Sequence, residues 1–296
     1  MDRSTSLRLF GANAGLIYSA AIWGSTFIVV KASLENIDPV ILVGYRFTLA
    51  AIILGIFLKA QGRRLMADCR RGCILGFLLW LLYVPQTIGL EFTTASNSAF
   101  ITGLFVAFVP MFSLFLFGRF PTIRDFIAVL VSLGGLWFLT GGLVHANRGD
   151  LLTLITAMTY ALHILYADKY LKEGIDPFVI AFQQFLFVGL LSLIGGLVLR
   201  LPFEIGTTET GLAVLFLAIF PTFSAFVIQM VAQRLIAPLR VSLIFALEPV
   251  FAAAFAWTLG GETFNTERAI GGALIVAAMI VSAIPSEKFK LRRTHP

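Results

Sequence analysis

Long apolar segments alternate with short polar connections along almost the whole chain. Each segment holds close to the roughly 20 residues that an α-helix needs to cross about 30 Å of hydrocarbon. Backbone groups inside a bilayer must bond within the chain, and the short alternating segments of a membrane β-barrel do not occur in the sequence. The pattern therefore predicts an all-α membrane protein with ten transmembrane helices, at residues 12–32, 39–58, 73–91, 96–117, 124–142, 150–168, 177–199, 209–231, 237–259 and 267–285.

Turn-forming residues mark the predicted helix ends. Asp38-Pro39 and Asp176-Pro177 are expected to begin helices, because Pro is favoured in the first turn of a helix. Gly118, Gly141-Gly142 and Gly260-Gly261 are expected to end them.

Composition excludes a water-soluble protein. Of the 296 residues, 58% are hydrophobic and 13% are charged, with a mean hydropathy of +0.92. A soluble domain carries about 25% charged residues. The sequence contains no HExxH or GxSxG motif, so we do not expect an enzyme. No cofactor or metal is expected either, since Cys69 and Cys73 have no second pair of Cys or His ligands nearby.

The distribution of basic residues predicts the orientation in the membrane. The net charge is +6, but the basic residues form short runs between apolar segments rather than one water-exposed face, which argues against a nucleic-acid partner. Most of the 22 Lys and Arg residues lie in the terminal segments and in every second loop, and the other loops hold only Lys31, Arg148, Arg200 and Arg268. Cytoplasmic loops are enriched in Lys and Arg. We therefore expect both termini in the cytoplasm and the protein in a bacterial inner (plasma) membrane.

A short motif occurs at corresponding places in the two halves. Glu35-Asn36-Ile37-Asp38-Pro39 follows the first predicted span, and Glu173-Gly174-Ile175-Asp176-Pro177 follows the sixth. Five spans in each half is an odd number, so the second half would enter the membrane from the opposite side. The sequence thus predicts two inverted five-helix repeats, at residues 1–146 and 147–296, an arrangement that many secondary transporters share.

Several segments occur in a recognisable order along both halves. They are Ile22-Trp23-Gly24-Ser25-Thr26-Phe27 with Lys31, Tyr45-Arg46-Phe47, Thr94-Ala95-Ser96-Asn97-Ser98-Ala99-Phe100, Val109-Pro110, Ala232-Gln233-Arg234, Glu248-Pro249-Val250-Phe251 and Leu259-Gly260-Gly261-Glu262. Together they resemble the drug/metabolite transporter (DMT) superfamily, specifically its EamA-type ten-helix members. One departure is that the first half has Gly118-Arg119 where the second has Gly261-Glu262, so the repeats are not equivalent at that loop.

The resemblance implies a secondary active transporter that exports small organic metabolites, such as amino acids or amphiphilic compounds, by alternating access. It also implies that a proton or substrate gradient drives transport and that the solute binds between the two halves. The expected partners are a small-molecule solute and the lipid bilayer. Two alternatives stay open, an importer of the same solutes and a non-transporting membrane scaffold or channel.

Two charged residues lie deep inside the predicted spans, Arg46 and Glu248. An ionised side chain at the bilayer centre costs about 2.5–3.5 kcal/mol on insertion scales, so each needs a function or a partner. Their predicted depths are similar, which allows them to pair. In the functional hypothesis Arg46 binds a substrate carboxylate and Glu248 carries a coupling proton. In the structural alternative the two form an ion pair that locks the halves together.

Uncharged polar and aromatic residues complete the candidate substrate-binding set. Each has a polar group that needs a partner inside the membrane, which favours either a solute cavity or an interhelical contact. These residues are Trp23, Tyr83, Gln86, Asn97, Tyr160, His163 and Gln184, the last being the repeat mate of Arg46.

Proline and glycine predict bends and close contacts. Pro110 and Pro249 are repeat mates, so we expect symmetric kinks that serve gating, with a static bend as the alternative. Pro221 also falls within a span. The pairs Gly134-Gly135 and Gly271-Gly272 are expected to allow close helix crossings.

Overall fold

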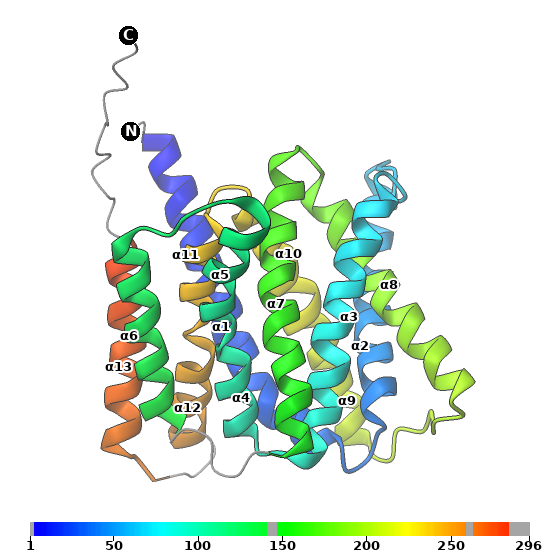
Figure 1. The fold of residues 1–296 in the computed structure, drawn as a ribbon. Helices are drawn as coiled ribbons and strands as arrows, with labels where there is room; N and C mark the ends of the chain where they lie inside the picture. The colour runs from blue at the N-terminus through cyan, green and yellow to red at the C-terminus, as the bar shows by residue number, and fades with distance from the viewer. Residues whose placement is uncertain (1–2, 141–146, 259–262, 284–296) are drawn as a thin grey trace.

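The computed structural model describes residues 3–140, 147–258 and 263–283, and this part of the chain contains helices and no strand (Figure 1). The predicted boundary at residue 146, the ends of spans 124–142, 237–259 and 267–285, and the glycine pairs at 141–142 and 260–261 lie at least partly outside the described residues. The helices are α1 (Arg3–Ser33), α2 (Pro39–Ala60), α3 (Cys69–Phe92), α4 (Ala95–Gly103), α5 (Phe105–Phe117), α6 (Ile123–Thr140), α7 (Arg148–Lys172), α8 (Pro177–Val198), α9 (Thr208–Leu217), η1 (Ala218–Ser224), α10 (Ala225–Gln233), α11 (Pro238–Phe245), α12 (Glu248–Thr258) and α13 (Thr266–Ala283).

The two Asp-Pro motifs begin helices, as predicted. The Asp38 carboxylate accepts hydrogen bonds from the backbone N–H groups of Val40 and Ile41, at 2.8 and 3.2 Å. Asp176 caps α8 in the same way. Gly118 follows α5 with a φ of 61°, which confirms the predicted helix end.

Eight helical stretches within the described residues are long and apolar enough to cross a membrane. Three of them join consecutive helices, namely α4 with α5, α9 with η1 and α10, and α11 with α12. The remaining helices, α6 and α13, pack against each other (Figure 1). The chain therefore forms an integral membrane protein, and the count of ten spans stays a prediction.

Interruptions divide two of the predicted spans into separate helices. The segment 96–117 is interrupted at Leu104, and the segment 237–259 at residues 246–247. Pro249 explains the second interruption, because it has no N–H to donate to the Phe245 carbonyl. Pro110 lies inside α5, beyond the Leu104 interruption, so the two prolines do not occupy the same place relative to the breaks.

Corresponding helices of the two halves pack in a similar way. α1 contacts α10, α11 and α12, whereas α7 contacts α3, α4 and α5. α2 packs on α8. α1 and α7 run in opposite directions through the molecule (Figure 1). At the crossing of α6 and α13, a Cβ on Gly271 would lie 2.6 Å from the Gly135 carbonyl oxygen, which confirms the predicted close contact.

Candidate functional site

Aromatic rings from both halves meet in the middle of the molecule. Trp23 of α1 and Tyr83 of α3 have ring centroids 5.0 and 5.9 Å from that of Phe226 of α10. Tyr160 of α7 lies 6.3 Å from Trp23 and 6.1 Å from Phe245 of α11. These five residues, with His163, whose ring is 6.3 Å from Phe226, form what we call the central aromatic cluster.

Arg46 of α2 borders this cluster and is only 2% exposed. Its guanidinium carbon lies 4.7 Å from the centre of the Tyr83 ring and 5.4 Å from that of Phe47. Its Nε donates a hydrogen bond of 2.9 Å to Thr222 Oγ1. Its Nη2 is buried and has no hydrogen-bond partner among the described residues. A buried cation with a free donor is suited to bind an anionic group.

Glu248 also borders the cluster, as the first residue of α12. Its side chain is buried, and its Oε2 has no hydrogen-bond partner among the described residues. Its backbone carbonyl oxygen packs against Gly24 of α1, the residue next to Trp23. Arg46 and Glu248 form no ion pair in the structure, because the Arg46 Nε is turned towards Thr222. The cluster therefore contains an arginine and a carboxyl group that are not paired with each other.

The π-helical segment η1 contacts α1 and α2 and accepts hydrogen bonds from two side chains of the site. Trp23 Nε1 donates to the Pro221 carbonyl oxygen at 2.8 Å. Thr222 Oγ1, which accepts from Arg46, itself donates to the Leu217 carbonyl oxygen at 2.7 Å. Short π-helical segments are frequent at functional sites. The sequence pointed to this place only through Pro221, and gave no signal for Thr222 or Phe226.

His163 and Gln184 join α7 to α8 beside the cluster. His163 Nε2 and Gln184 Oε1 are 2.6 Å apart, and Gln184 Nε2 donates to the Ile180 carbonyl oxygen at 3.1 Å. The other ring nitrogen of His163, Nδ1, is buried and has no partner among the described residues. Gln184 thus fixes the ring while Nδ1 is left available.

The structure places two of the predicted residues apart from the cluster. Gln86 lies on α3 and donates to Thr102 Oγ1 at 2.9 Å. Asn97 is in the first turn of α4, where its backbone N–H donates to the Thr94 N-cap at 3.1 Å. The Gln86 side chain thus connects α3 to α4.

A glycine lets α1 approach the second half closely at this site. A Cβ on Gly24 would lie 2.6 Å from the Glu248 carbonyl oxygen and 2.9 Å from the Ala252 nitrogen. Any larger residue would therefore push α1 away from α12. Gly24 follows Trp23, so the same turn of α1 supplies a cluster side chain and the contact with α12.

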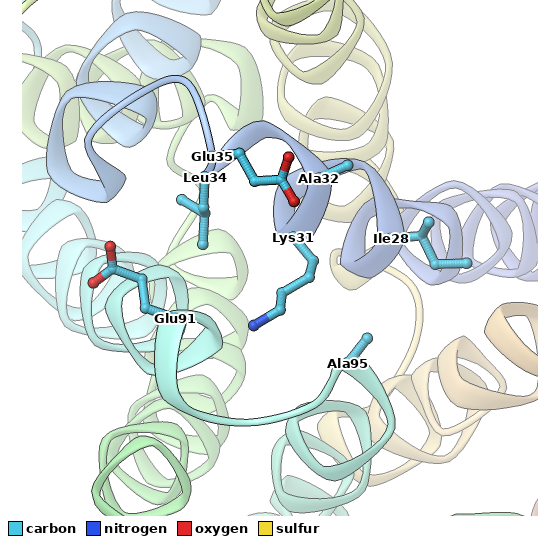
Figure 2. A pocket seen from close by; sticks show the side chains of 7 residues that line it. All are labelled: Ile28, Lys31, Ala32, Leu34, Glu35, Glu91 and Ala95. Carbon is cyan, nitrogen blue, oxygen red and sulfur yellow. The ribbon is translucent and has the colours of Figure 1, made fainter.

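A separate cavity of about 520 Å³ lies at the C-terminal end of α1. Figure 2 shows Lys31 extending across this cavity towards the turn between α3 and α4. The Lys31 ammonium donates to the carbonyl oxygens of Leu90 and Thr93, the latter at 3.1 Å. Glu35 and Glu91 line the same cavity. Lys31 thereby connects α1 to the end of α3.

Among the described residues, no group of three or more His, Cys, Asp or Glu side chains is arranged to hold a metal ion. The polar groups of the cluster come from separate helices and include a cation, a carboxyl group and an imidazole. This combination is suited to bind a small polar or charged molecule within an aromatic enclosure.

Comparison with known proteins agrees with this architecture. A relative from Archaeoglobus fulgidus, named as an uncharacterized transporter, is 33% identical over 92% of this chain and 86% of its own length. The Escherichia coli relative YedA, named as an uncharacterized inner membrane transporter, is 28% identical over 93% of this chain and 90% of its own length. A solved crystal structure with 18% identity has a TM-score of 0.80, covering 94% of this chain and 98% of that one, and so shares the fold.

The model of one protein family matches the chain in two consecutive segments. It covers residues 11–141 and 147–284 and is described as the EamA-like transporter family. Helices of the two segments line the central aromatic cluster together. The chain is a transporter that belongs to the EamA-like family of the drug/metabolite transporter type.

Proposed function

We propose that the protein is a secondary active transporter that exports a small organic solute, such as an amino acid or an amphiphilic compound, across the bacterial inner membrane. Its solute site is the central aromatic cluster, with Arg46 binding a carboxylate and Glu248 carrying a coupling proton. The observation that carries the proposal is that three buried polar atoms from both halves meet at this cluster, Arg46 Nη2, His163 Nδ1 and Glu248 Oε2, and none has a hydrogen-bond partner among the described residues. Buried polar groups without partners are rare in proteins and need a reason.

The proposed mechanism is alternating access by two inverted five-helix repeats, at residues 1–146 and 147–296. The two family matches and the opposite directions of α1 and α7 support this arrangement. In such folds the solute site lies near the midplane, where the repeats meet. The helix interruptions at Leu104 and at residues 246–247 lie near Pro110 and Pro249, and we assign the gating movements to these positions.

The solute site is tested by ligand-induced stabilisation. A molecule that binds the native state raises the unfolding temperature, so a panel of amino acids and amphiphilic amines is screened against the purified protein. A carboxylate-bearing ligand should stabilise the wild type and not Arg46→Gln, whereas Lys59→Gln, on the exposed end of the same helix, should behave as the wild type. Equal stabilisation of Arg46→Gln would refute the assigned role of Arg46.

The coupling role of Glu248 is tested in proteoliposomes with the ligand found in that screen. Glu248→Gln keeps the shape of the side chain and removes its titration. We expect net transport driven by a pH gradient to be lost while solute counterflow is kept. Glu267→Gln, on the exposed first turn of α13, is the matched control and should keep both activities. An unchanged response of Glu248→Gln to the gradient would contradict proton coupling.

The same proteoliposomes distinguish a carrier from a channel or a scaffold. A carrier shows faster uptake when solute is present on the far side, and a channel or scaffold does not. Export predicts that cells lacking the protein accumulate the solute, whereas import predicts that they take up less.

The inverted topology, with both termini in the cytoplasm, is tested by labelling single cysteines. Glu35→Cys and Glu173→Cys are exposed repeat mates and would be made in a Cys69→Ser/Cys73→Ser background, because both native cysteines are free. An impermeant reagent outside the cell should label Glu35→Cys only. Labelling of both from one side would exclude the inverted arrangement.

A further inference from the structure

The end of the molecule that carries the connections α2–α3 and α7–α8 has a cavity that the transport mechanism does not use. It measures about 390 Å³ and lies between the N-terminal end of α3 and the C-terminal end of α7. These two helices pack side by side (Figure 1). The cavity is lined by Asp68, Arg70, Arg71, Ile74, Lys169, Tyr170 and Glu173.

The charges in this cavity are unevenly matched. Arg71 binds both acidic groups, with Nη1 at 3.0 Å from Asp68 and Nη2 at 2.8 Å from Glu173. Arg70 and Lys169 are exposed and have no ion-pair partner within the part of the chain that the structure describes. Arg71 therefore pairs with both carboxylates of the cavity. Arg70 and Lys169 line the same cavity without a carboxylate partner among the described residues.

Below these two cations the surface becomes apolar. Ile74 and Phe77 lie one and two turns beyond Arg70 on α3 and are 36% and 47% exposed. On α7, Leu162 and Met158 precede Lys169 at a spacing that places them on the same side of the helix, and both are also at least partly exposed. Both sets lie within stretches that are apolar enough to cross a membrane. The cations thus lie next to exposed apolar side chains of α3 and α7, on segments apolar enough to lie in a membrane.

We propose that this cavity binds the phosphate headgroup of an anionic phospholipid, with an acyl chain lying along the exposed apolar side chains of α3. Arg70 and Lys169 bind the phosphate oxygens, and Ile74 and Phe77 contact the chain. Basic pockets between transmembrane helices on the cytoplasmic side are suited to anionic headgroups, and charge-assisted hydrogen bonds to phosphate are strong. The continuity of the cations with the lipid-facing surface favours a lipid over a soluble phosphate compound.

The test is a titration of the delipidated full-length protein in detergent, followed by native mass spectrometry. Phosphatidylglycerol and phosphatidylcholine with identical acyl chains are compared. The wild type should bind phosphatidylglycerol more tightly than phosphatidylcholine, and the Arg70→Gln/Lys169→Gln variant should lose about 30-fold in affinity for the former, from the usual contribution of two basic residues near an anionic lipid. Lys59→Gln/Arg64→Gln changes the charge equally at the same end and should bind as the wild type.

Three outcomes would overturn the proposal. They are equal binding of the two lipids by the wild type, equal losses in the double variant and its control, and displacement of phosphatidylglycerol by inorganic phosphate. The last result would assign the cavity to a soluble phosphate compound. If the double variant does not fold, as judged by its unfolding temperature without lipid, Lys169→Gln alone gives the same comparison with a smaller expected loss. The result is independent of transport, so it does not affect the proposed solute site.

Discussion

The C-terminal ends of α1 and α7 have related sequences but different contacts. Lys31 at the end of α1 donates to the carbonyl oxygens of Leu90 and Thr93 and so connects α1 to α3 (Figure 2). Its repeat mate Lys169 faces a cavity and has no ion-pair partner among the described residues. At this end the connection is made by Asp168, which is fully buried and lies 3.1 Å from Arg119 and 2.5 Å from Lys172.

Neighbouring residues account for this difference. In the repeat register, Val30 of α1 and Leu34, which directly follows α1, correspond to Asp168 and Lys172 of α7. At the first end Lys31 therefore binds backbone carbonyls at the end of a helix, where carbonyl groups lack partners. The second has a carboxylate with two cations. The repeated motif thus does not make the two ends equivalent, because each end is held by different contacts.

The largest expected effect on stability comes from replacing Asp168 of α7 with Val, the residue at the corresponding position of α1. Asp168→Val leaves Arg119 and Lys172 without their partner. Loss of one partner of a fully buried ion pair costs about 3–5 kcal/mol. Because the Arg119 and Lys172 side chains are 50% and 46% exposed, we expect the free energy of unfolding to fall by about 2 kcal/mol. The unfolding temperature in detergent measures this, with Asp168→Asn expected to lose less. An unchanged temperature for Asp168→Val would show that the ion pairs do not stabilise this end.

A smaller effect is expected for the cation of α1. Lys31→Met removes the hydrogen bonds to the Leu90 and Thr93 carbonyls, at a cost of about 1.5 kcal/mol, and should also slow transport because α1 is released from α3. Lys169→Met is the matched control and should change the unfolding free energy by less than about 0.5 kcal/mol. Equal effects of the two variants would mean that the two ends are equivalent after all.

The N-cap residues of α2 and α8, which follow these two ends in the chain, should have more similar effects on stability when they are replaced. Asp38→Ala and Asp176→Ala each remove a side chain that caps a helix, which costs about 1 kcal/mol. Asp176 also binds Arg63 at 2.8 Å, so Asp176→Ala should lose a few tenths of a kcal/mol more. Comparative unfolding in the same detergent measures both. A smaller loss for Asp176→Ala than for Asp38→Ala would argue against a stabilising Arg63 contact.

The smallest expected effect is the salt dependence of the difference in unfolding free energy between Asp38→Ala and Asp176→Ala. The Arg63 and Asp176 side chains are 34% and 39% exposed, and charges in 1 M salt are screened beyond about 3 Å. The difference between the two cap variants should therefore shrink in 1 M salt, while the shared loss of about 1 kcal/mol stays. A difference that does not respond to salt would assign it to packing, such as the Arg63 contact with the Phe178 ring.

The predictable part of the fold and the site depends on local patterns. The apolar segments, the Asp-Pro helix starts and the end at Gly118 involve residues only a few positions apart, and the structure contains them. Among the candidate residues, Trp23, Tyr83, Tyr160 and His163 do meet in one cluster. Their polar groups inside apolar segments were the signal, because such groups need partners in a membrane, but Gln86 and Asn97 had the same signal and lie apart from the cluster.

Other features had no local signal. The Leu104 interruption follows neither a Pro nor a Gly pair, and Phe226 is one of 29 Phe residues in an apolar chain. Equal depth in the membrane allowed Arg46 and Glu248 to pair, but depth does not give the direction of a side chain around the helix axis. Packing of the helices decided that direction and turned Arg46 towards Thr222.

By itself the sequence determined that this chain lies in a membrane, where α2 and α8 begin, and that a motif occurs in both of its halves. Those properties follow from the length of apolar segments, from caps formed within three residues and from a motif that occurs twice. Only the tertiary structure decided which polar groups meet, since the partner of Arg46 is 176 residues away in the chain. A contact of that kind depends on how all the intervening helices pack, and no short pattern of residues specifies it.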